Sequence, residues 1–382
     1  MVNIKKIDLE SSRLSKTSFD AKNGDFIPES SIIKSSFGDE NGEVELLFLE
    51  NGTSLVEKDG IGMAYTDQDG FFESLHINND FKMLNYSGAR ELSSSLVEEF
   101  SGPHSKPRIL LTDFNGNVKA YYGEDVMGET ASVAKIFVAL AACELLDPNY
   151  EIEITRDAVD IAWPSNDIGC KAGDKITVSE ALSSGFPLSD NVAANSLVIE
   201  LGKKYCNCSD NRDAYNKGLN FLNAYLQKKG FNTRLSTAAG FNTGADFDYS
   251  NYGISKSQNW GARQIDVTNC LMQLYNNKVF RESFRNKSSI DTFKISLEKH
   301  EAVRDYMKKD NILTGADLFG GDKKDGLYFI KSGTQGYNSG TFVIVDQGEV
   351  DFLTMQGINT IDDGGNYIEL AHSIYQDYIN SK

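Results

Sequence analysis

An apolar run that holds two closely spaced polar residues constrains this chain more than any other feature. Residues 131–146 are rich in Ala and Leu and contain no Gly or Pro, which predicts a helix. The run is apolar on almost every side, so we expect the helix to be buried all round. Ser132 and Lys135 interrupt it near its start, and their spacing of three places both on one face.

The position of these two residues indicates a specific chemistry. Ser132 falls in the first turn, where free backbone N–H groups and the helix dipole favour developing negative charge. A buried lysine tends to lose its proton, because burial disfavours the charged form. A neutral amine one turn from a hydroxyl is a candidate general base for a serine nucleophile. The Ser-x-x-Lys spacing alone is weak, since it occurs by chance in many long chains.

Composition and charge narrow the class of protein. The chain has 382 residues, enough for two or three domains, and a net charge of -17. That charge disfavours nucleic acid and anionic membrane surfaces as partners. We expect no transmembrane helix, because no run of 18 or more apolar residues occurs, and no signal peptide, because no apolar segment follows the first residues. A cytoplasmic protein and a trimmed form of an exported one both remain open.

The five cysteines do not indicate a disulfide framework, because an odd number leaves at least one thiol free. Cys143 and Cys270 lie in helical runs and are expected to be core residues. Cys206 and Cys208 are close enough to share a metal ion, but histidine is scarce and none is nearby. We therefore expect no metal site.

The chain divides by pattern near residue 87. In residues 1–87 we expect a polar, arm-like segment up to residue 40 and then a small β-rich module. Its strands are predicted at 43–49, 62–66 and 71–77. No catalytic group is evident in this part, so a structural or docking role is the default.

Residues 88–382 alternate helices and strands in an informative order. A helix over 89–100 and a hairpin over 108–122 come first, helices fill the middle, and strands return near the end. An amphipathic helix over 367–379 closes the chain. This order predicts an α+β fold in which both ends of the domain build one antiparallel sheet and an all-helical lobe lies between them.

Two further motifs follow Ser132-x-x-Lys135 along the chain. They are Ser189-Asp190-Asn191 and Lys331-Ser332-Gly333-Thr334. In this order, the three motifs resemble those of the penicillin-recognising serine hydrolases, which include class A β-lactamases and D-alanyl-D-alanine carboxypeptidases. The resemblance covers about residues 88–382 and implies a β-lactamase/transpeptidase-like fold. The long separation of the second and third motifs implies an insertion.

The resemblance implies a role for each catalytic residue. Ser132 Oγ would attack a carbonyl and form an acyl-enzyme, with Lys135 taking its proton. Ser189 would relay a proton to the leaving amine with help from Lys331. Asn191 would hydrogen-bond the substrate amide.

The third motif also implies substrate binding. Lys331 would attract a substrate carboxylate, and Ser332 and Thr334 would hydrogen-bond to it. Gly333, between them, belongs to the same substrate-binding segment. The backbone N–H groups of Ser132 and Thr334 would form the oxyanion hole. No cofactor or metal is implied, because all three motifs concern metal-free acyl transfer.

One departure from the pattern bears on turnover. Class A β-lactamases activate the deacylating water with a glutamate in the loop that here follows Arg234. No glutamate occurs between Leu201 and Arg281. Asp246 or Asp248 could replace it only with a shifted backbone. An acyl-enzyme formed from a β-lactam is therefore expected to persist.

These observations lead to one main hypothesis and two alternatives. The first is a serine hydrolase resembling D,D-carboxypeptidases and acting on D-alanyl-D-alanine ends of peptidoglycan-type peptides. The second is a class A-like β-lactamase or another serine amidase or esterase. The third is a sensor that binds a β-lactam or peptidoglycan and acylates without turnover. The resemblance implies work outside the cytoplasm or at the cell surface, and neither the partner of the N-terminal module nor the oligomeric state follows from the sequence.

Overall fold

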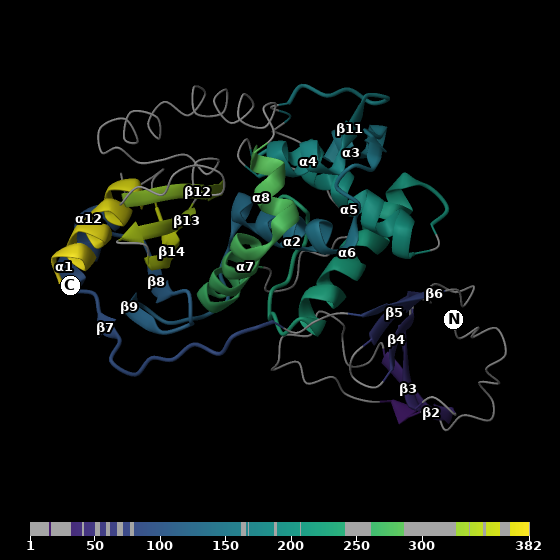
Figure 1. Ribbon diagram of the computed structural model, residues 1–382, viewed down its shortest axis with the longest axis horizontal. Coiled ribbons are helices and arrows are strands. Elements are labelled where there is room, and N and C mark those ends of the chain that lie inside the picture. Colours follow the sequence, from purple (N-terminus) through teal and green to yellow (C-terminus); the bar gives the residue numbers. More distant parts are fainter. Residues whose placement is uncertain are drawn as a thin grey trace. The chain divides into compact units, whose positions relative to one another are not determined.

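The structure of the protein is a computed structural model (Figure 1). It describes the backbone of six N-terminal strands and residues 80–161, 166, 168–186, 189–206, 208–240, 261–285, 326–335, 337–346, 349–359 and 367–381. The chain forms two compact units. The first comprises Met1–Phe81, Val198–Arg234 and Asp248–Gln258, and the second comprises Lys82–Leu197, Leu235–Phe247 and Asn259–Lys382. The boundary near residue 87 expected from the sequence stays a prediction.

The first unit contains an antiparallel meander in which each strand pairs with the next. Its strands are β1 Ser15–Lys16, β2 Ile32–Asp39, β3 Gly42–Leu49, β4 Ser54–Lys58, β5 Gly62–Thr66 and β6 Phe72–His76. The three strands predicted here are confirmed as β3, β5 and β6. The expectation of an arm up to residue 40 is wrong for 32–39, because β2 pairs along its whole length with β3.

The second unit is built on a six-stranded sheet of order β12-β13-β14-β8-β9-β7. The strands are β7 Arg90–Glu91, β8 Arg108–Asp113, β9 Val118–Tyr122, β12 Gly326–Gln335, β13 Tyr337–Asp346 and β14 Glu349–Ile358. All neighbours are antiparallel except the short β7, which runs parallel to β9. Because β14 pairs with β8, both ends of the unit share one sheet, as the sequence predicted.

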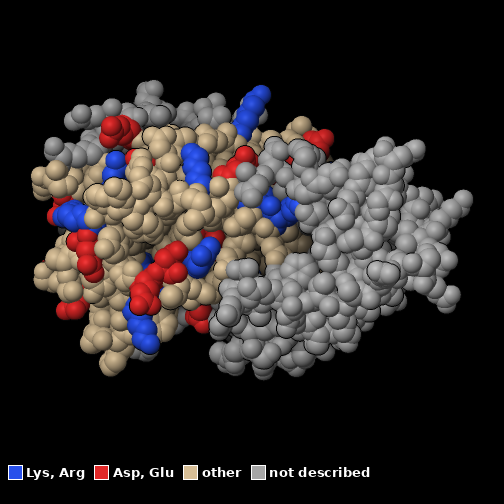
Figure 2. Space-filling model, turned by 90° about the horizontal axis from the view of Figure 1, so that it is seen from below, with Lys and Arg blue, Asp and Glu red and all other residues tan. Residues whose placement is uncertain are grey.

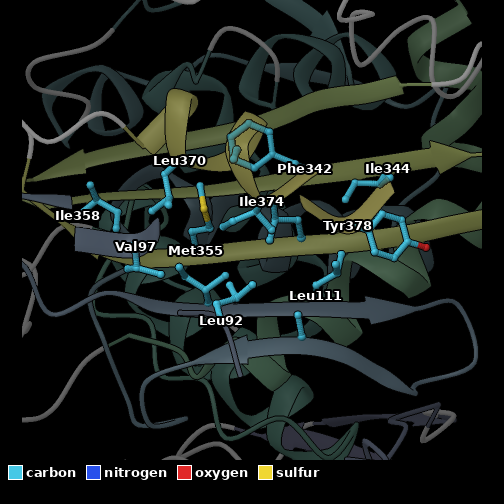
Figure 3. Packing of buried hydrophobic residues seen from close by; sticks show 14 residues of the cluster. Leu92, Val97, Leu111, Phe342, Ile344, Met355, Ile358, Leu370, Ile374 and Tyr378 are labelled. Atoms are coloured by element: carbon cyan, nitrogen blue, oxygen red, sulfur yellow. The ribbon is translucent and has the colours of Figure 1, made fainter. Parts of the chain in front are cut away.

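One face of this sheet carries a hydrophobic core under α1 (Ser94–Ser101) and α12 (Tyr367–Asn380) (Figure 3). Leu353 and Met355 of β14 point into this core, together with Ala371 and Ile374 of α12. The predicted terminal helix is therefore confirmed, with its apolar side on the sheet. The helix predicted from residue 89 begins later, at Ser94, because Ser93 caps it and the residues before it pair with β9.

The opposite face of the sheet is covered by α7 (Gln264–Asn276). Thr354 alternates with the core residues of β14 and meets Thr268 of α7 at 3.2 Å between their hydroxyls. The other helices of the middle region are α2 Lys135–Leu145, α3 Arg156–Ile161, α4 Val178–Gly185, α5 Asn191–Tyr205, α6 Asn211–Lys228 and α8 Lys278–Arg285. β10 (Glu151–Glu153) and β11 (Lys175–Thr177) form a separate two-stranded antiparallel sheet, and α3 lies between them in sequence.

Local signals in the sequence explain several helix ends. The start of α4 is a capping box: Thr177 Oγ1 accepts from the backbone N–H of Glu180, whose carboxylate accepts from that of Thr177. Cys143 and Cys270 are buried, as expected. On the face shown in Figure 2, acidic and basic side chains are interspersed, so the described residues form no single-sign patch there. None of the helices that the structure describes is long and apolar enough to cross a membrane.

Candidate active site

The Ser132–Lys135 pair stands at the start of the central buried helix. Residues Ala131–Ala134 form a single turn of 3-10 helix, η4, and α2 continues from Lys135. The predicted helix is confirmed, although its first turn is tighter than an α-helix. Lys135 is only 2% exposed, and its Nζ donates a hydrogen bond of 2.7 Å to Ser132 Oγ. This is the geometry that proton transfer between a serine and an amine requires.

The backbone just before the nucleophile is held in an uncommon conformation. Ala131 has φ of 43°, in the left-handed region that side chains other than Gly rarely adopt. Gly240 lies directly against it, because a Cβ at residue 240 would stand 2.0 Å from the Ala131 carbonyl oxygen. The surrounding structure therefore fixes the turn that presents Ser132, which is common at functional sites.

The second motif forms the turn into α5. Ser189 also has a positive φ, of 60°, and Asn191 is the first residue of α5 and is buried. Asp190 fixes this turn from within: one carboxylate oxygen accepts from the N–H of Ala193 at 2.8 Å and the other from that of Ile168 at 2.9 Å. Asp190 thus caps α5, in agreement with the preference for aspartate just before a helix.

Lys331 brings the third motif to the second. It projects from β12, is 2% exposed, and donates from Nζ to Ser189 Oγ at 2.9 Å and to the Ser332 carbonyl oxygen. Burial lowers the pKa of Lys331 well below its ordinary value, and the nearby charge of Lys135 lowers that pKa further. Gly333, two residues after Lys331 in β12, lies against the backbone nitrogen of Ser132, so the two Ser–Lys pairs belong to one site.

Gly333 allows β12 to pass against the nucleophile's turn. A Cβ on this residue would stand 2.6 Å from the backbone nitrogen of Ser132 and 2.7 Å from the Thr130 carbonyl oxygen. Only glycine fits such an approach. Thr334 follows in β12 and pairs with Asn338 of β13. The predicted oxyanion hole of the Ser132 and Thr334 N–H groups stays a prediction.

Ser332 faces the other way from Lys331 and Gly333. Its side chain hydrogen-bonds with Tyr367, the first residue of α12, while burial raises the pKa of that tyrosine. The ring of Tyr367 also packs over Gly340, where a Cβ would approach it to 3.2 Å. The predicted binding of a substrate carboxylate by Ser332 stays a prediction. Tyr367 was missed by sequence reasoning, because nothing in the local sequence links it to β12.

Some residues that the sequence singled out cannot be placed. Asp246 and Asp248, the possible substitutes for the class A glutamate, lie outside the described residues. Within the described part of the chain, no three His, Cys, Asp or Glu side chains gather in a way that could hold a metal ion.

Comparison with known proteins decides the family. Residues 91–289, more than half of the chain, match the model of the β-lactamase enzyme family. The chain belongs to this family. It is thus one of the penicillin-recognising serine hydrolases, as its three motifs predicted. No curated protein matched the sequence.

The solved structures compared below share the fold of this β-lactamase family member but little of its sequence. A penicillin-binding protein homolog from Mycobacterium tuberculosis is 16% identical with a TM-score of 0.51, covering 74% of this chain and 94% of its own. A D-alanyl-D-alanine carboxypeptidase from the same organism is 18% identical with a TM-score of 0.50, covering 72% and 91%. A mutant Streptomyces DD-transpeptidase is 15% identical with a TM-score of 0.50, covering 72% and 96%. These likenesses establish the β-lactamase/transpeptidase-like fold.

Proposed function

We propose that this protein is a serine acyl-transferring hydrolase of the D,D-carboxypeptidase type, acting on the D-alanyl-D-alanine ends of peptidoglycan-type peptides. The observation that carries the proposal is the pairing of two serines with two buried lysines, Ser132 with Lys135 at 2.7 Å and Ser189 with Lys331 at 2.9 Å. Membership of the β-lactamase family supports the same chemistry.

Acylation follows from this geometry. For acylation Lys135 must first lose its own proton. Its neutral amine then accepts the proton of Ser132 Oγ, which attacks the carbonyl carbon of the penultimate residue. The carbonyl oxygen becomes an oxyanion, and backbone N–H groups of Ser132 and Thr334 stabilise it by about 3–4 kcal/mol each. The C–N bond then breaks, and the leaving amine takes a proton from Ser189 Oγ. Lys331 replaces that proton through its hydrogen bond to the same hydroxyl.

Lys331 also suits the end of such a substrate. Its burial disfavours the charged ammonium, so an arriving carboxylate supplies the negative partner that the ammonium lacks. Carboxylate binding should therefore favour the protonated form, which is the form that can pass a proton toward Ser189. Asn191, Ser332 and Thr334 complete the proposed contacts, with Asn191 on the substrate amide.

The absence of a glutamate between residues 201 and 281 separates the proposal from a class A β-lactamase. Without that base, the acyl-enzyme of a β-lactam lacks the usual means of activating water. We therefore expect the acyl-enzyme formed from a β-lactam to last longer than the acyl-enzyme formed from a peptide. Because peptidoglycan lies outside the cytoplasm, the proposed function also places the mature protein there or at the cell surface.

The first test is intact-protein mass spectrometry after mixing with a fluorescent penicillin, followed over hours. Wild-type protein should gain the mass of one penicillin and keep it, and Ser132→Ala should gain nothing. Ser95→Ala, at an exposed position of α1, is the matched control and should behave as wild type. An adduct that clears rapidly would indicate a β-lactamase, and no adduct would overturn the proposal.

The second test separates an enzyme from a sensor. A peptide that ends in D-alanyl-D-alanine is incubated with wild-type protein, and free D-alanine is measured. Release of many equivalents of D-alanine per protein is expected. A single equivalent, with the acyl group retained on Ser132, would instead identify a sensor that acylates and stalls.

A further inference from the structure

Tyr367, the first residue of α12, is connected to the third motif by its hydroxyl. This hydroxyl hydrogen-bonds with the side chain of Ser332, which lies between Lys331 and Gly333 in β12. The proposed reaction uses Ser332 but gives Tyr367 no part. Because a serine hydroxyl can rotate, its partners decide where its proton points. The tyrosine is therefore placed to control the direction of the Ser332 hydroxyl.

The geometry of β13 explains how the tyrosine reaches this serine. Gly340 of β13 is the register partner of Ser332, so it stands directly beside Ser332 in the sheet. A Cβ at residue 340 would come within 3.2 Å of the Tyr367 ring, which therefore passes over this glycine. Phe342, two residues further along β13, packs against the same ring with centroids 6.4 Å apart. The position of the tyrosine hydroxyl at Ser332 thus follows from the packing of its ring on the neighbouring strand.

Ser332 is more accessible than the residues on either side of it. Lys331 and Gly333 are buried, whereas Ser332 is only partly buried. β12 is also the outermost strand of the described sheet. A ligand beside an outermost strand can contact side chains of both its faces, because the two faces meet at that edge. A substrate carboxylate attracted by Lys331 can therefore reach the Ser332 hydroxyl as well.

The protons of the two hydroxyls decide the direction of their hydrogen bond once a carboxylate is bound. An ionised carboxylate accepts hydrogen bonds and has no proton to give. Ser332 must then donate its single proton to the carboxylate, so toward Tyr367 it can only accept. Burial raises the pKa of Tyr367, so the tyrosine hydroxyl keeps its proton and is able to donate. The two hydrogen bonds run in the same direction, and each polarises the other.

We propose that Tyr367 is a positioning residue for substrate binding: it donates to Ser332 Oγ and thereby turns the Ser332 hydroxyl toward the carboxylate of the substrate. The inference rests on the proposed function, because it needs a substrate that ends in a carboxylate. Tyr367 acts only through Ser332 and does not touch the substrate itself. Without the tyrosine hydroxyl, the Ser332 hydroxyl is free to rotate, and its charge-assisted hydrogen bond to the carboxylate weakens.

The test compares two β-lactams that differ only in the carboxylate: benzylpenicillin and its methyl ester, in which the carboxylate is blocked. Intact-protein mass spectrometry measures the second-order rate constant for acylation of Ser132 by each compound. Tyr367→Phe keeps the ring over Gly340 but removes the hydroxyl. Acylation by benzylpenicillin should slow about three- to tenfold in this variant, whereas acylation by the methyl ester should stay at the wild-type rate.

Two further measurements show whether Tyr367 acts through Ser332. Ser332→Ala should show the same selective loss with benzylpenicillin, and adding Tyr367→Phe to it should slow acylation no further. Tyr375→Phe is the matched control, because Tyr375 belongs to the same helix and packs against the same hydrophobic core. It should leave both rate constants unchanged.

The outcomes separate this inference from the proposed function. An unchanged rate with benzylpenicillin in Tyr367→Phe, or an equal loss with both compounds, would overturn the inference while wild-type acylation still supported the proposed function. An additional loss in the double variant would also overturn it, since Tyr367 would then act independently of Ser332. If the wild-type protein formed no adduct at all, the proposed function would fail and the inference with it.

Discussion

The two Ser–Lys pairs of the site have nearly the same geometry but different origins. Ser132 and Lys135 are three residues apart and meet across one helical turn at 2.7 Å. Ser189 and Lys331 are 142 residues apart and meet at 2.9 Å only because a turn and a strand are brought together. The first pair follows from local structure, whereas the second depends on tertiary structure. A change in tertiary structure can therefore separate Ser189 from Lys331 while the helix that carries Ser132 and Lys135 stays intact.

Two further residues position the Ser189–Lys331 pair. Asp190 holds the turn of Ser189 through two backbone N–H groups, and Gly333 lets β12 approach Ser132. The local pair depends on α2 itself and on the turn of Ala131, which lies against Gly240. We therefore expect substitutions at the Ser132–Lys135 pair to slow acylation. Substitutions that affect the Ser189–Lys331 pair should slow acylation and also lower the free energy of unfolding.

The largest effect is expected at the local pair. Lys135→Met removes the proposed base for Ser132, so acylation by penicillin should slow by about 10²–10⁴-fold. The rate of adduct formation, followed by fluorescence on a gel, measures this. Lys175→Met removes an exposed lysine and serves as the control. A Lys135→Met protein that acylates at the wild-type rate would show that another group takes the proton.

A methyl group added at Gly333 should disturb the Ser189–Lys331 pair. Gly333→Ala places a Cβ within 2.6 Å of the Ser132 nitrogen, so we expect a loss of about 1–3 kcal/mol in the free energy of unfolding together with slower acylation. Urea denaturation measures the first quantity. Gly185→Ala, whose Cβ meets only ordinary contacts of 3.4 Å and beyond, should lose neither. Equal behaviour of the two variants would contradict the close approach of β12.

A pH series sharpens the comparison through Lys331. Its folded pKa lies below its ordinary value of 10.5, so the unfolded chain binds more protons between the two pKa values. The contribution of Lys331 to the free energy of unfolding must therefore rise with pH across that window, up to about 10.5. Lys331→Met should remove this contribution and flatten the slope. Identical slopes for the variant and wild type would mean that the lysine is not desolvated.

The smallest effect is expected at Tyr367. Tyr367→Phe removes the hydrogen bond with Ser332 but keeps the ring over Gly340, so the free energy of unfolding should fall by about 0.5–1.5 kcal/mol. Tyr337→Phe, at an exposed position, is the control and should change little. Equal losses in the two variants would show that the Ser332–Tyr367 hydrogen bond does not contribute to the free energy of unfolding.

The same contrast explains how far the sequence could predict this structure. Helical periodicity is local, so α2 and α12 were predicted nearly as observed. The spacing of Ser132 and Lys135 predicted their contact for the same reason. The start of α1 was missed because the preceding residues pair with β9, a partner that lies far along the chain.

The missed features of the site are likewise those that depend on distant partners. Nothing near Tyr367 indicates that it contacts Ser332. The order of three motifs did predict the family, because it encodes a tertiary arrangement that single residues do not. The positive φ of Ala131 has no signal in its side chain, since alanine rarely adopts it.

The pairing of β8 with β14 has a consequence for biosynthesis. β8 begins at Arg108, but the strand beside it ends only at Ile358. A ribosome must therefore deliver nearly the whole chain before this sheet can close, and such long-range pairing is intrinsically slow. The turn with Ser132 emerges early, yet the strand that carries Lys331 arrives late. A chain whose synthesis stops early thus carries Ser132 and Lys135 without Lys331 and β12, so only chains that extend beyond β12 can assemble both Ser–Lys pairs.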